Sequence, residues 1–364
     1  MKKKRILFAA VDIGYRIEHY TKFIDKYLSD KLVAESFSKY ILPETHYKTK
    51  YTYSCPIDKT HPLLLYLYSV SFFIFSLFRY DIFHFISGET ILTRKLRRYE
   101  LWVYRLFGKK VIMHFVGSDI RSEDYIKWKG ENIEEYLEGT KNKPKMTEEF
   151  QDKLISDARK YARRIIVSTP DLLEIMPEAI YFPVLIDANE FEEKFRQDQN
   201  VNSSVIKVLH SPSGFGLKGS LYIETILAEL KEIYQDKIEL MLPGKDKRSS
   251  YSMTRYDLLH TFKKTDIVID QMLIGWYGLK SVEALTYGCN VVCYIEKGLE
   301  NYIEEDNPII NANVINLKSK LASLIDELLI SNDRSKRLKE NRSFIFRYHH
   351  IYAHKEFFKK LWFE

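Results

Sequence analysis

Residues 266–295 read DIVIDQMLIGWYGLKSVEALTYGCNVVCYI, and this stretch decides the fold. It begins with a short apolar strand, IVI, and continues through a loop that contains Gly275 and Gly278. A helix is expected from Leu279 to Tyr287, where Gly288 ends it, and a second apolar strand, VVCYI, follows. A strand, a loop, a helix and a second strand in this order predict a βαβ unit with a parallel sheet.

The same stretch predicts a ligand site. In parallel sheets, ligands lie beyond the carboxyl ends of the strands, where a loop leads into a helix. The backbone N–H groups at Gly278 and just after it are expected to be bare and able to bind an anion such as a diphosphate. Glu283 lies one helical turn further on and can face the same ligand. The alternative is an ordinary βαβ unit in which Glu283 is a solvated helix residue.

This segment resembles the donor-sugar site of GT-B glycosyltransferases, in particular glycosyltransferase family 4, whose pattern there is E-G-F-G-L-x-x-x-E-A-x-x-x-G-x-P-V-V. The spacing is kept at Gly275, Trp276, Tyr277, Gly278, Leu279, Glu283, Ala284, Gly288, Val291 and Val292. Gly275 departs from the pattern, because it replaces the first glutamate, which in the family touches the transferred sugar. The second glutamate binds the ribose. The resemblance implies a retaining, nucleotide-sugar-dependent enzyme in which Tyr277, Gly278, Leu279 and Glu283 bind the donor.

Length and composition agree with two globular domains. The chain has 364 residues, of which 45% are hydrophobic and 29% charged, and such a length suggests about two domains. The net charge of +6 is too mild for a dedicated nucleic-acid binder, whereas phosphorylated substrates or anionic lipid headgroups would suit it. Cys289 and Cys293 are read as core thiols in a reducing compartment. Because Met1–Arg5 runs directly into a strand, no secretory signal is expected and the protein is predicted to be cytoplasmic.

The order of elements predicts where the domains begin and end. Strands are expected at 6–14, 80–86 and 109–116, a strand and a capped helix at 163–176, and a polar linker at 191–204. The resemblance therefore implies an α/β GT-B fold, with two doubly wound Rossmann-like domains facing across a cleft. We assign 1–190 to an N-terminal acceptor-binding domain, 205–335 to a C-terminal nucleotide-sugar-binding domain, and 336–364 to a C-terminal helix that packs back on the N-terminal domain.

Further donor contacts are expected where the chain resembles other family segments. The segment LHSPSGFGLKGS resembles a loop that ends in Lys-Gly. Gly216 would admit a phosphate and Lys218 would stabilise the departing diphosphate, although Lys218 is also readable as a surface lysine in a turn. His210 lies where an arginine is common and would complete the clamp. Gly244 belongs to a segment that resembles the V-G-x-G strand end. Gly14 either lets the opening loop approach the diphosphate or only ends a strand.

Two residues of the N-terminal half are candidate catalytic groups beside Lys218. His114 ends a strand where the family has a histidine that contacts the donor sugar, although a lone histidine on an apolar strand is more often structural. Asp119 is expected to orient an acceptor hydroxyl, to accept its proton, or to cap the next helix. No metal and no cofactor are expected, and the substrate is a nucleotide sugar, with UDP or GDP as the expected carrier.

The acceptor side is predicted from two segments. Residues 61–78 form a nearly charge-free apolar run that falls short of the ~20 residues needed to span a bilayer. It is either a buried helix or a helix lying in a membrane surface. Residues 94–110 mix basic and aromatic side chains, as suits an anionic interface. A core helix beside a solvated one is the alternative.

We expect a saccharide or lipid-linked saccharide acceptor in surface polysaccharide or glycoconjugate assembly, and a peripheral position at the inner face of a membrane. No nucleic-acid partner is expected. A non-catalytic sugar-nucleotide-binding or partner homologue, and a nucleotide-sugar epimerase, are the rival functions.

Overall fold

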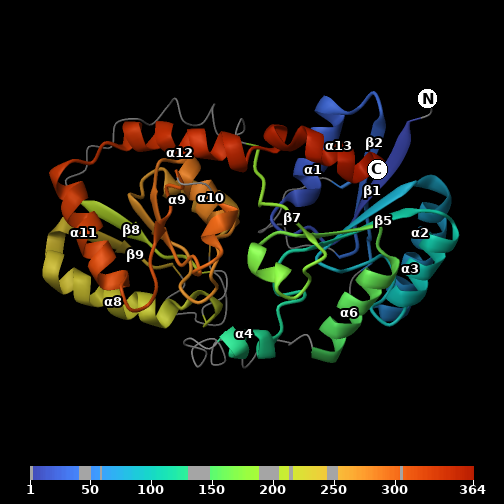
Figure 1. Ribbon diagram of the computed structural model, residues 1–364, viewed down its shortest axis with the longest axis horizontal. Coiled ribbons are helices and arrows are strands. Elements are labelled where there is room, and N and C mark those ends of the chain that lie inside the picture. The colour runs from blue at the N-terminus through green and yellow to red at the C-terminus, as the bar shows by residue number, and fades with distance from the viewer. Residues whose placement is uncertain are drawn as a thin grey trace. The chain divides into compact units, whose positions relative to one another are not determined.

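The computed structural model describes residues 3–40, 51–57, 60–129, 148–187, 205–212, 216–243, 253–303 and 306–364. Contacts between residues divide the chain into two compact units. Of the described residues, the N-terminal unit holds 3–123, 148–185 and 354–364, and the C-terminal unit holds 124–129 and 186–353. Each unit is an α/β structure with its own parallel sheet (Figure 1).

The described strands of the N-terminal unit are β1 Lys4–Ala10, β2 Leu32–Ser38, β3 Tyr53–Ser54, β4 Ile82–Ile86, β5 Lys110–Phe115, β6 Arg164–Val167 and β7 Ile180–Tyr181. Its helices are α1 Arg16–Tyr27, α2 Pro62–Arg79, α3 Arg97–Leu106, α6 Glu148–Tyr161, the 3-10 helix η1 Pro170–Leu173 and α13 Lys355–Phe363. The strands pair in parallel in the order β3-β2-β1-β4-β5-β6-β7. The order reverses between β1 and β4, which is the switch point of a doubly wound sheet.

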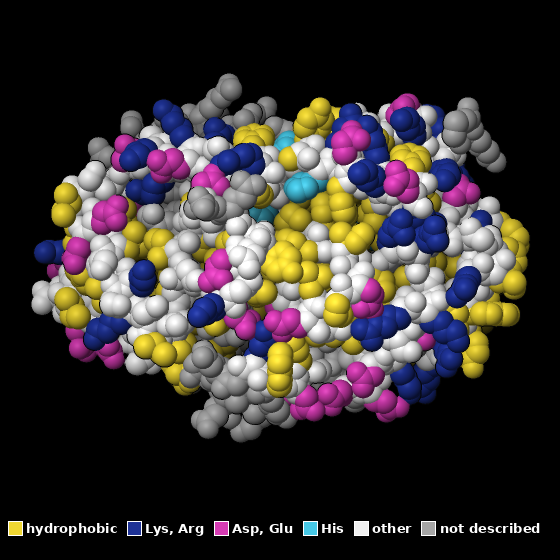
Figure 2. Space-filling model, viewed as in Figure 1, with side chains coloured by type: hydrophobic (Ala, Val, Ile, Leu, Met, Phe, Trp, Pro, Cys, Tyr) yellow, Lys and Arg dark blue, Asp and Glu magenta, His cyan; other side chains and the backbone are white. Residues whose placement is uncertain are grey.

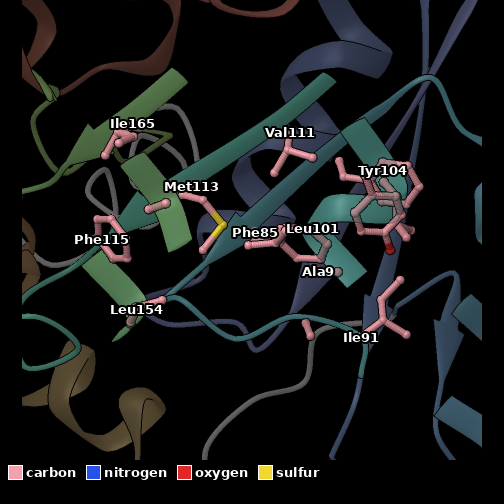
Figure 3. Close-up of a cluster of buried hydrophobic side chains, with 14 of the residues drawn as sticks. Ala9, Phe85, Ile91, Leu101, Tyr104, Val111, Met113, Phe115, Leu154 and Ile165 are labelled. Atoms are coloured by element: carbon pink, nitrogen blue, oxygen red, sulfur yellow. The ribbon is translucent and has the colours of Figure 1, made fainter. Parts of the chain in front are cut away.

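Helices cover both faces of this sheet. On one face, Leu101 and Tyr104 of α3 pack with Phe85 of β4 and Met113 of β5, in a cluster that also receives α2 and α6 (Figure 3). On the other face, Tyr20 of α1 packs against the aromatic rings of α13. Two apolar layers around one sheet are what a parallel sheet requires.

The C-terminal unit has the described strands β8 Ile206–Leu209, β9 Ile238–Met241, β10 Ile267–Ile269, β11 Asn290–Cys293 and β12 Ile310–Asn311. Its helices are α4 Glu123–Lys129, α8 Ser220–Tyr234, α9 Arg255–Phe262, α10 Leu279–Thr286, α11 Leu317–Ile330 and α12 Arg334–Tyr348, with the 3-10 helices η2 Gly216–Lys218, η3 Gln235–Lys237, η4 Glu300–Tyr302 and η5 Ile351–His354. The strands pair in parallel in the order β12-β11-β10-β8-β9, so the switch point lies between β8 and β10.

The predicted βαβ unit is confirmed. Strands β10 and β11 pair in parallel, and α10 lies between them in the sequence. The helix ends where Gly288 takes φ 73°, a left-handed conformation that glycine adopts without steric cost. The N–H of Gly288 then bonds the carbonyl of Leu285. Cys289 and Cys293 are buried on either side of this pairing, as expected.

Several expected boundaries differ in the structure. Residues 336–364 are not one helix on the N-terminal domain: α12 packs on α10 of the C-terminal unit, where Asn341 and Phe344 are buried, and only α13 belongs to the N-terminal unit. The helix expected near Pro170 is the single 3-10 turn η1, because the side chain of Asp171 bonds Arg121 and Pro177 follows. The expected linker 191–204 lies outside the described residues.

Candidate functional site

The switch point of the C-terminal unit gathers charged residues from three elements. The chain leaves β8 towards β9 on one side, and β10 lies on the other, so the loops after β8 and β10 diverge around a crevice. Lys218 lies in η2, after β8, and Asp270 directly follows β10. Ser281 comes from the first turn of α10.

A fully buried carboxylate, Asp270, organises this crevice. Nζ of Lys218 donates to Oδ1 of Asp270 at 2.7 Å and to Oε1 of Gln271 at 2.7 Å. Oδ2 of Asp270 accepts from Oγ of Ser281 at 2.7 Å and from the N–H of Gly278 at 3.4 Å. The expectation that the start of α10 is bare is therefore wrong, since a carboxylate of the protein already lies there and is stabilised by the helix dipole.

Lys280 brings a second cation to the same carboxylate. Its Nζ is buried and has no hydrogen-bond partner among the described residues. Burial lowers the pKa of Lys280 to about 8, with the charge of Asp270 opposing the shift. Burial also raises the pKa of Asp270, but the charges of Lys218 and Lys280 outweigh this and hold that pKa below its usual range. Asp270 thus forms an ion pair with Lys218, and the charge of Lys280 acts on the same carboxylate without a direct hydrogen bond, which leaves positive charge available for an anionic ligand.

Glu283 is not the solvated helix residue of the alternative reading. It is buried, and its Oε1 accepts from Nε of Arg255 at 2.8 Å and pairs with Nη2 at 2.7 Å. Arg255 begins α9, so the pair ties α9 to α10. A bidentate guanidinium fixes the orientation of the carboxylate.

His210 and Tyr277 are engaged within the protein. Nδ1 of His210 lies 3.0 Å from the carbonyl oxygen of Ile269, and Nε2 lies 2.8 Å from Oγ of Ser220. Burial lowers the pKa of His210 to about 3, so the ring is neutral. This geometry gives no support to a diphosphate clamp at His210. The hydroxyl of Tyr277 lies 3.1 Å from Nε2 of His349, beside α12.

The other residues predicted to bind the donor in this unit are Gly216, Leu279 and Gly244. Gly216 is buried at the start of η2, and Gly219 takes φ 70° directly after Lys218, so the chain turns sharply as it presents the lysine. Leu279 is half-buried as the first residue of α10. Gly244 lies outside the described residues.

Steric crowding explains why position 275 is a glycine. A Cβ atom added there would lie 2.3 Å from Cβ of Glu296 and 3.0 Å from its Oε2. Glu296 follows β11, and its N–H bonds the carbonyl of Gly275 at 3.0 Å. Its Oε1 also pairs with Nζ of Lys129 at 2.8 Å. Glu296 therefore fills the space in which a glutamate at position 275 would begin.

The switch point of the N-terminal unit lies beside the loop after β1. Gly14 takes φ 67° and Tyr15 φ 58°, so this loop makes a left-handed turn before α1 that favours glycine at position 14. Asp12 is buried in the loop, and its Oδ1 accepts from the N–H of Ile17 at 3.1 Å. Its Oδ2 has no partner among the described residues, and burial raises the pKa of Asp12 to about 6.

His114 is a buried, neutral member of a polar chain. Its Nε2 lies 2.9 Å from Oγ of Ser168, which accepts from Nη2 of Arg16 at 3.2 Å. Burial lowers the pKa of His114 well below its usual range, and the rings of Tyr20 and His84 flank it. Contact of His114 with a donor sugar stays a prediction.

Asp119 holds a backbone turn. Its Oδ1 accepts from the N–H of Gly117 at 2.8 Å, and its Oδ2 from the N–H of Val116 at 2.9 Å. Burial raises the pKa of Asp119, and these hydrogen bonds oppose the shift. The N–H groups that Asp119 binds precede α4, which begins at Glu123, so these contacts hold the turn after β5 and do not cap the next described helix. A role towards an acceptor stays a prediction.

Four charged residues of these clusters were not predicted: Asp12, Arg255, Asp270 and Lys280. Two of them had a detectable signal, because Asp270 directly follows a buried strand and Lys280 lies in the first turn of the helix that follows. Arg255 had none. Among the described residues, no group of three His, Cys, Asp or Glu side chains is arranged to hold a metal ion.

No family model and no curated protein matches the sequence, whereas solved structures do. HepE of Anabaena, in complex with UDP and glucose, aligns over 99% of both chains at 13% identity with a TM-score of 0.61. Sucrose-phosphate synthase of Thermosynechococcus elongatus aligns over 99% of this chain and 98% of its own at 12% identity with a TM-score of 0.65. A putative UDP-N-acetylglucosamine 2-epimerase of Listeria monocytogenes covers 99% and 96% at 12% identity with a TM-score of 0.56.

The first two of these structures are GT-B glycosyltransferases, and the likeness runs nearly the full length of the chain. The α/β GT-B fold expected from the sequence, built from two doubly wound Rossmann-like units, is therefore confirmed.

Proposed function

We propose that this chain is a glycosyltransferase that moves a sugar from a UDP- or GDP-sugar to a saccharide or lipid-linked saccharide acceptor. The observation that carries the proposal is the pair of lysines, Lys218 and Lys280, that share the buried carboxylate of Asp270 at the switch point between β8 and β10. HepE, which has a similar fold, was crystallised with UDP and glucose. A diphosphate would supply the second negative charge that this cluster lacks.

The chemistry follows from the position of the charges. The leaving group of a nucleotide sugar is a diphosphate that gains negative charge as the sugar departs, and fixed positive groups stabilise that charge. Lys218 is held in the crevice by Asp270 and Gln271, and a diphosphate would compete with Asp270 for it. The two lysines would do the electrostatic work that a divalent ion does in other transferases, which supports transfer without a metal.

The nucleoside is assigned to Glu283. The carboxylate of Glu283, on α10, is held by Arg255 of α9. We propose that it accepts ribose hydroxyls, as the resemblance to glycosyltransferase family 4 implies. Membership of that family and retention of the anomeric configuration are part of the proposal. The anomeric form of the first product, followed by NMR, tests retention.

We propose that Glu296 contacts the transferred sugar of the donor. Its carboxylate lies beside the position from which the missing glutamate at 275 would extend. Glu296→Gln should lower turnover while leaving UDP affinity unchanged, because UDP lacks the transferred sugar that Glu296 would contact. Lys129→Met removes the ion-pair partner and keeps the carboxylate, so it is the matched control. Equal turnover in native protein and Glu296→Gln would remove Glu296 from the sugar site.

The decisive experiment is a panel of UDP-, GDP-, ADP- and CDP-sugars. A ligand that binds only the folded protein raises its melting temperature, which identifies the base and the sugar. The selected donor is then assayed for hydrolysis and transfer in EDTA. Turnover that requires added metal contradicts metal independence. An epimerised donor would identify the epimerase suggested by the Listeria structure, and binding without turnover would identify a non-catalytic homologue.

The acceptor is proposed to be presented at a membrane, because α2 and α3 have exposed apolar faces. The sequence led us to expect a run too short to cross a membrane, but by length and composition α2 is long and apolar enough to do so. Only 22% of it is buried inside the structure, which excludes the fully buried alternative. Phe78 of α2 is 75% exposed, and its ring meets that of Phe107, just after α3, at 6.1 Å. Figure 2 shows hydrophobic side chains with Lys and Arg beside them where Figure 1 places α2 and α3.

Flotation with anionic liposomes tests this surface. Exchange of Leu64 and Phe78 for Gln should lower the partition coefficient roughly a hundredfold, since burying one such side chain contributes ~1.5–3 kcal/mol. Exchange of Ile233 and Ile330, exposed residues of the C-terminal unit, is the matched control. If the native protein stays unbound at low salt, a soluble acceptor replaces the lipid-linked one.

A further inference from the structure

A second charged cavity lies within the N-terminal unit, between the first halves of α3 and α6. Its volume is about 450 Å³. The walls carry five cationic side chains: Arg94, Lys95, Arg97, Arg98 and Lys153. Only two carboxylates, those of Glu149 and Asp157, line the same space. The α3–α6 pocket is therefore positive. None of its residues belongs to the donor cluster, and those from Arg94 to Tyr99 are part of the basic, aromatic segment 94–110.

Arg97 is a buried charged residue of the pocket, which distinguishes the pocket from a chance grouping of surface charges. Its side chain is only 2% exposed. Nε lies 3.4 Å from Oδ2 of Asp157, a long contact, and Nη1 is buried without a hydrogen-bond partner among the described residues. A buried donor without a partner is unfavourable, and more so when it is charged. A ligand oxygen at Nη1 would remove that cost.

Two guanidinium groups are held on one aromatic ring. The Cζ atoms of Arg94 and Arg97 lie 4.6 and 4.8 Å from the centroid of Phe150. Stacking limits the rotation of both planar forks, so each is oriented before a ligand arrives. Paired, oriented guanidinium groups match the oxygens of a phosphate better than they match a single carboxylate.

We infer that the α3–α6 pocket binds a phosphate or diphosphate group, with Arg97 donating to it from the floor and Lys95 and Arg98 from the rim. Glu149 pairs with Lys153 at 2.6 Å, Asp157 faces Arg97, and Glu89, from outside the lining, pairs with Arg94 at 2.6 Å. The charges of Lys95 and Arg98 remain in excess of these carboxylates. The phosphate has two chemical sources, a soluble phosphorylated compound or the headgroup of a lipid. Tyr99 lines the pocket and continues into the exposed apolar face of α3, beside which a lipid chain would lie.

Calorimetry with inorganic diphosphate on the full chain, with the donor cluster at Lys218 already saturated with UDP, tests the anion site. The variant exchanges Lys95 and Arg98, both exposed, for Gln, so the fold is expected to survive. The control exchanges Arg105 and Lys160, two charges on the same helices outside the pocket. Diphosphate affinity should fall at least tenfold in the variant and less than twofold in the control. Arg97→Lys, which keeps the charge and loses the fork, should also weaken binding.

UDP binding separates this inference from the proposed function. UDP affinity should be the same in native protein and the Lys95/Arg98 variant, because the donor cluster is untouched. If neither the native protein nor the Lys95/Arg98 variant binds UDP, the proposed function is contradicted, whereas the anion site in the α3–α6 pocket is not. Diphosphate binding that is absent, or equal in native protein and the variant, would overturn the pocket.

Vesicles distinguish the two sources of phosphate. Phosphatidic acid presents a phosphomonoester, whereas phosphatidylglycerol of equal surface charge presents only a diester. A preference for phosphatidic acid that the Lys95/Arg98 exchange abolishes identifies a lipid phosphate. Weakened diphosphate binding with unchanged flotation on both vesicles identifies a soluble phosphorylated ligand, and the anion site stands in either case.

Discussion

Replacement of Asp270 by Asn should make the protein less stable and, at the same time, a better binder of UDP. In the native protein Asp270 is the counter-charge of Lys218 and lies close to Lys280, and it is fully buried. Asparagine keeps the shape and one hydrogen-bond acceptor and removes the charge. Two lysines would then remain in the crevice without a negative counter-charge, although Lys218 keeps its hydrogen bond to Gln271, until an anionic ligand supplies one.

The magnitudes follow from the burial. Removing one partner of a buried ion pair typically costs 3–5 kcal/mol, and the retained amide oxygen favours a value of about 3 kcal/mol. For a unit of 150–250 residues this lowers the melting temperature by roughly 6–12 °C. Because the diphosphate no longer competes with Asp270 for Lys218, UDP affinity should rise about tenfold, which corresponds to ~1.4 kcal/mol.

Calorimetric unfolding with and without UDP measures both effects. Asp266→Asn is the matched control, because Asp266 is buried at the other end of β10, where it accepts from the N–H of Lys207 and from Asn332. This control should lose stability without any change in UDP affinity. Asp270→Asn with native stability, or with UDP affinity no higher than native, would refute the idea that the carboxylate and the diphosphate share the lysines.

Three further outcomes are expected at the same cluster. Glu283→Ala should raise the dissociation constant of the donor at least about tenfold by calorimetry, and unchanged affinity in the folded variant would remove Glu283 from the site. Lys218→Ala should lower single-turnover rates roughly a hundredfold, more than it lowers donor affinity; a fall in affinity alone would make it a ground-state binder. Since the pKa of Lys280 is lowered to about 8, it is charged below that pH, so UDP affinity should fall as the pH rises through about 8, and Lys280→Met should show no such step.

The fold was predictable where its signals are local. The βαβ unit from β10 to β11 is bounded by Gly278 and Gly288, and its apolar runs are short and uninterrupted. Strand β2 was missed, because its sequence, LVAESFS, mixes polar and apolar residues without a regular period, and Glu35 within it pairs with Arg5 and Arg79. Parallel pairing with β1 over five residues, rather than propensity, makes it a strand.

The site was predictable in its positions but not in its pairings. Lys218 and Glu283 were expected from their spacing to glycines, and the structure buries both. Arg255 stands 28 residues before Glu283, and Lys218 stands 52 residues before Asp270, so both ion pairs form only when the unit folds. His210 was expected to bind the diphosphate, but its Nδ1 contacts the carbonyl oxygen of Ile269. Ile269 lies on a different strand, so the local sequence does not reveal this contact.

The departure at Gly275 is best understood through its neighbour. A glutamate at 275 and Glu296 cannot both be present with this backbone, since their Cβ atoms would lie 2.3 Å apart. The clash involves Cβ atoms, so with this backbone any residue other than glycine at position 296 would exclude a side chain at 275, and in this chain that residue is Glu296. The sequence motif shows only that position 275 has no glutamate. Whether the site binds a sugar depends on where a carboxylate lies in space. Turnover of Glu296→Gln, and not the absence of a glutamate at 275, therefore separates a transferase from a binding homologue.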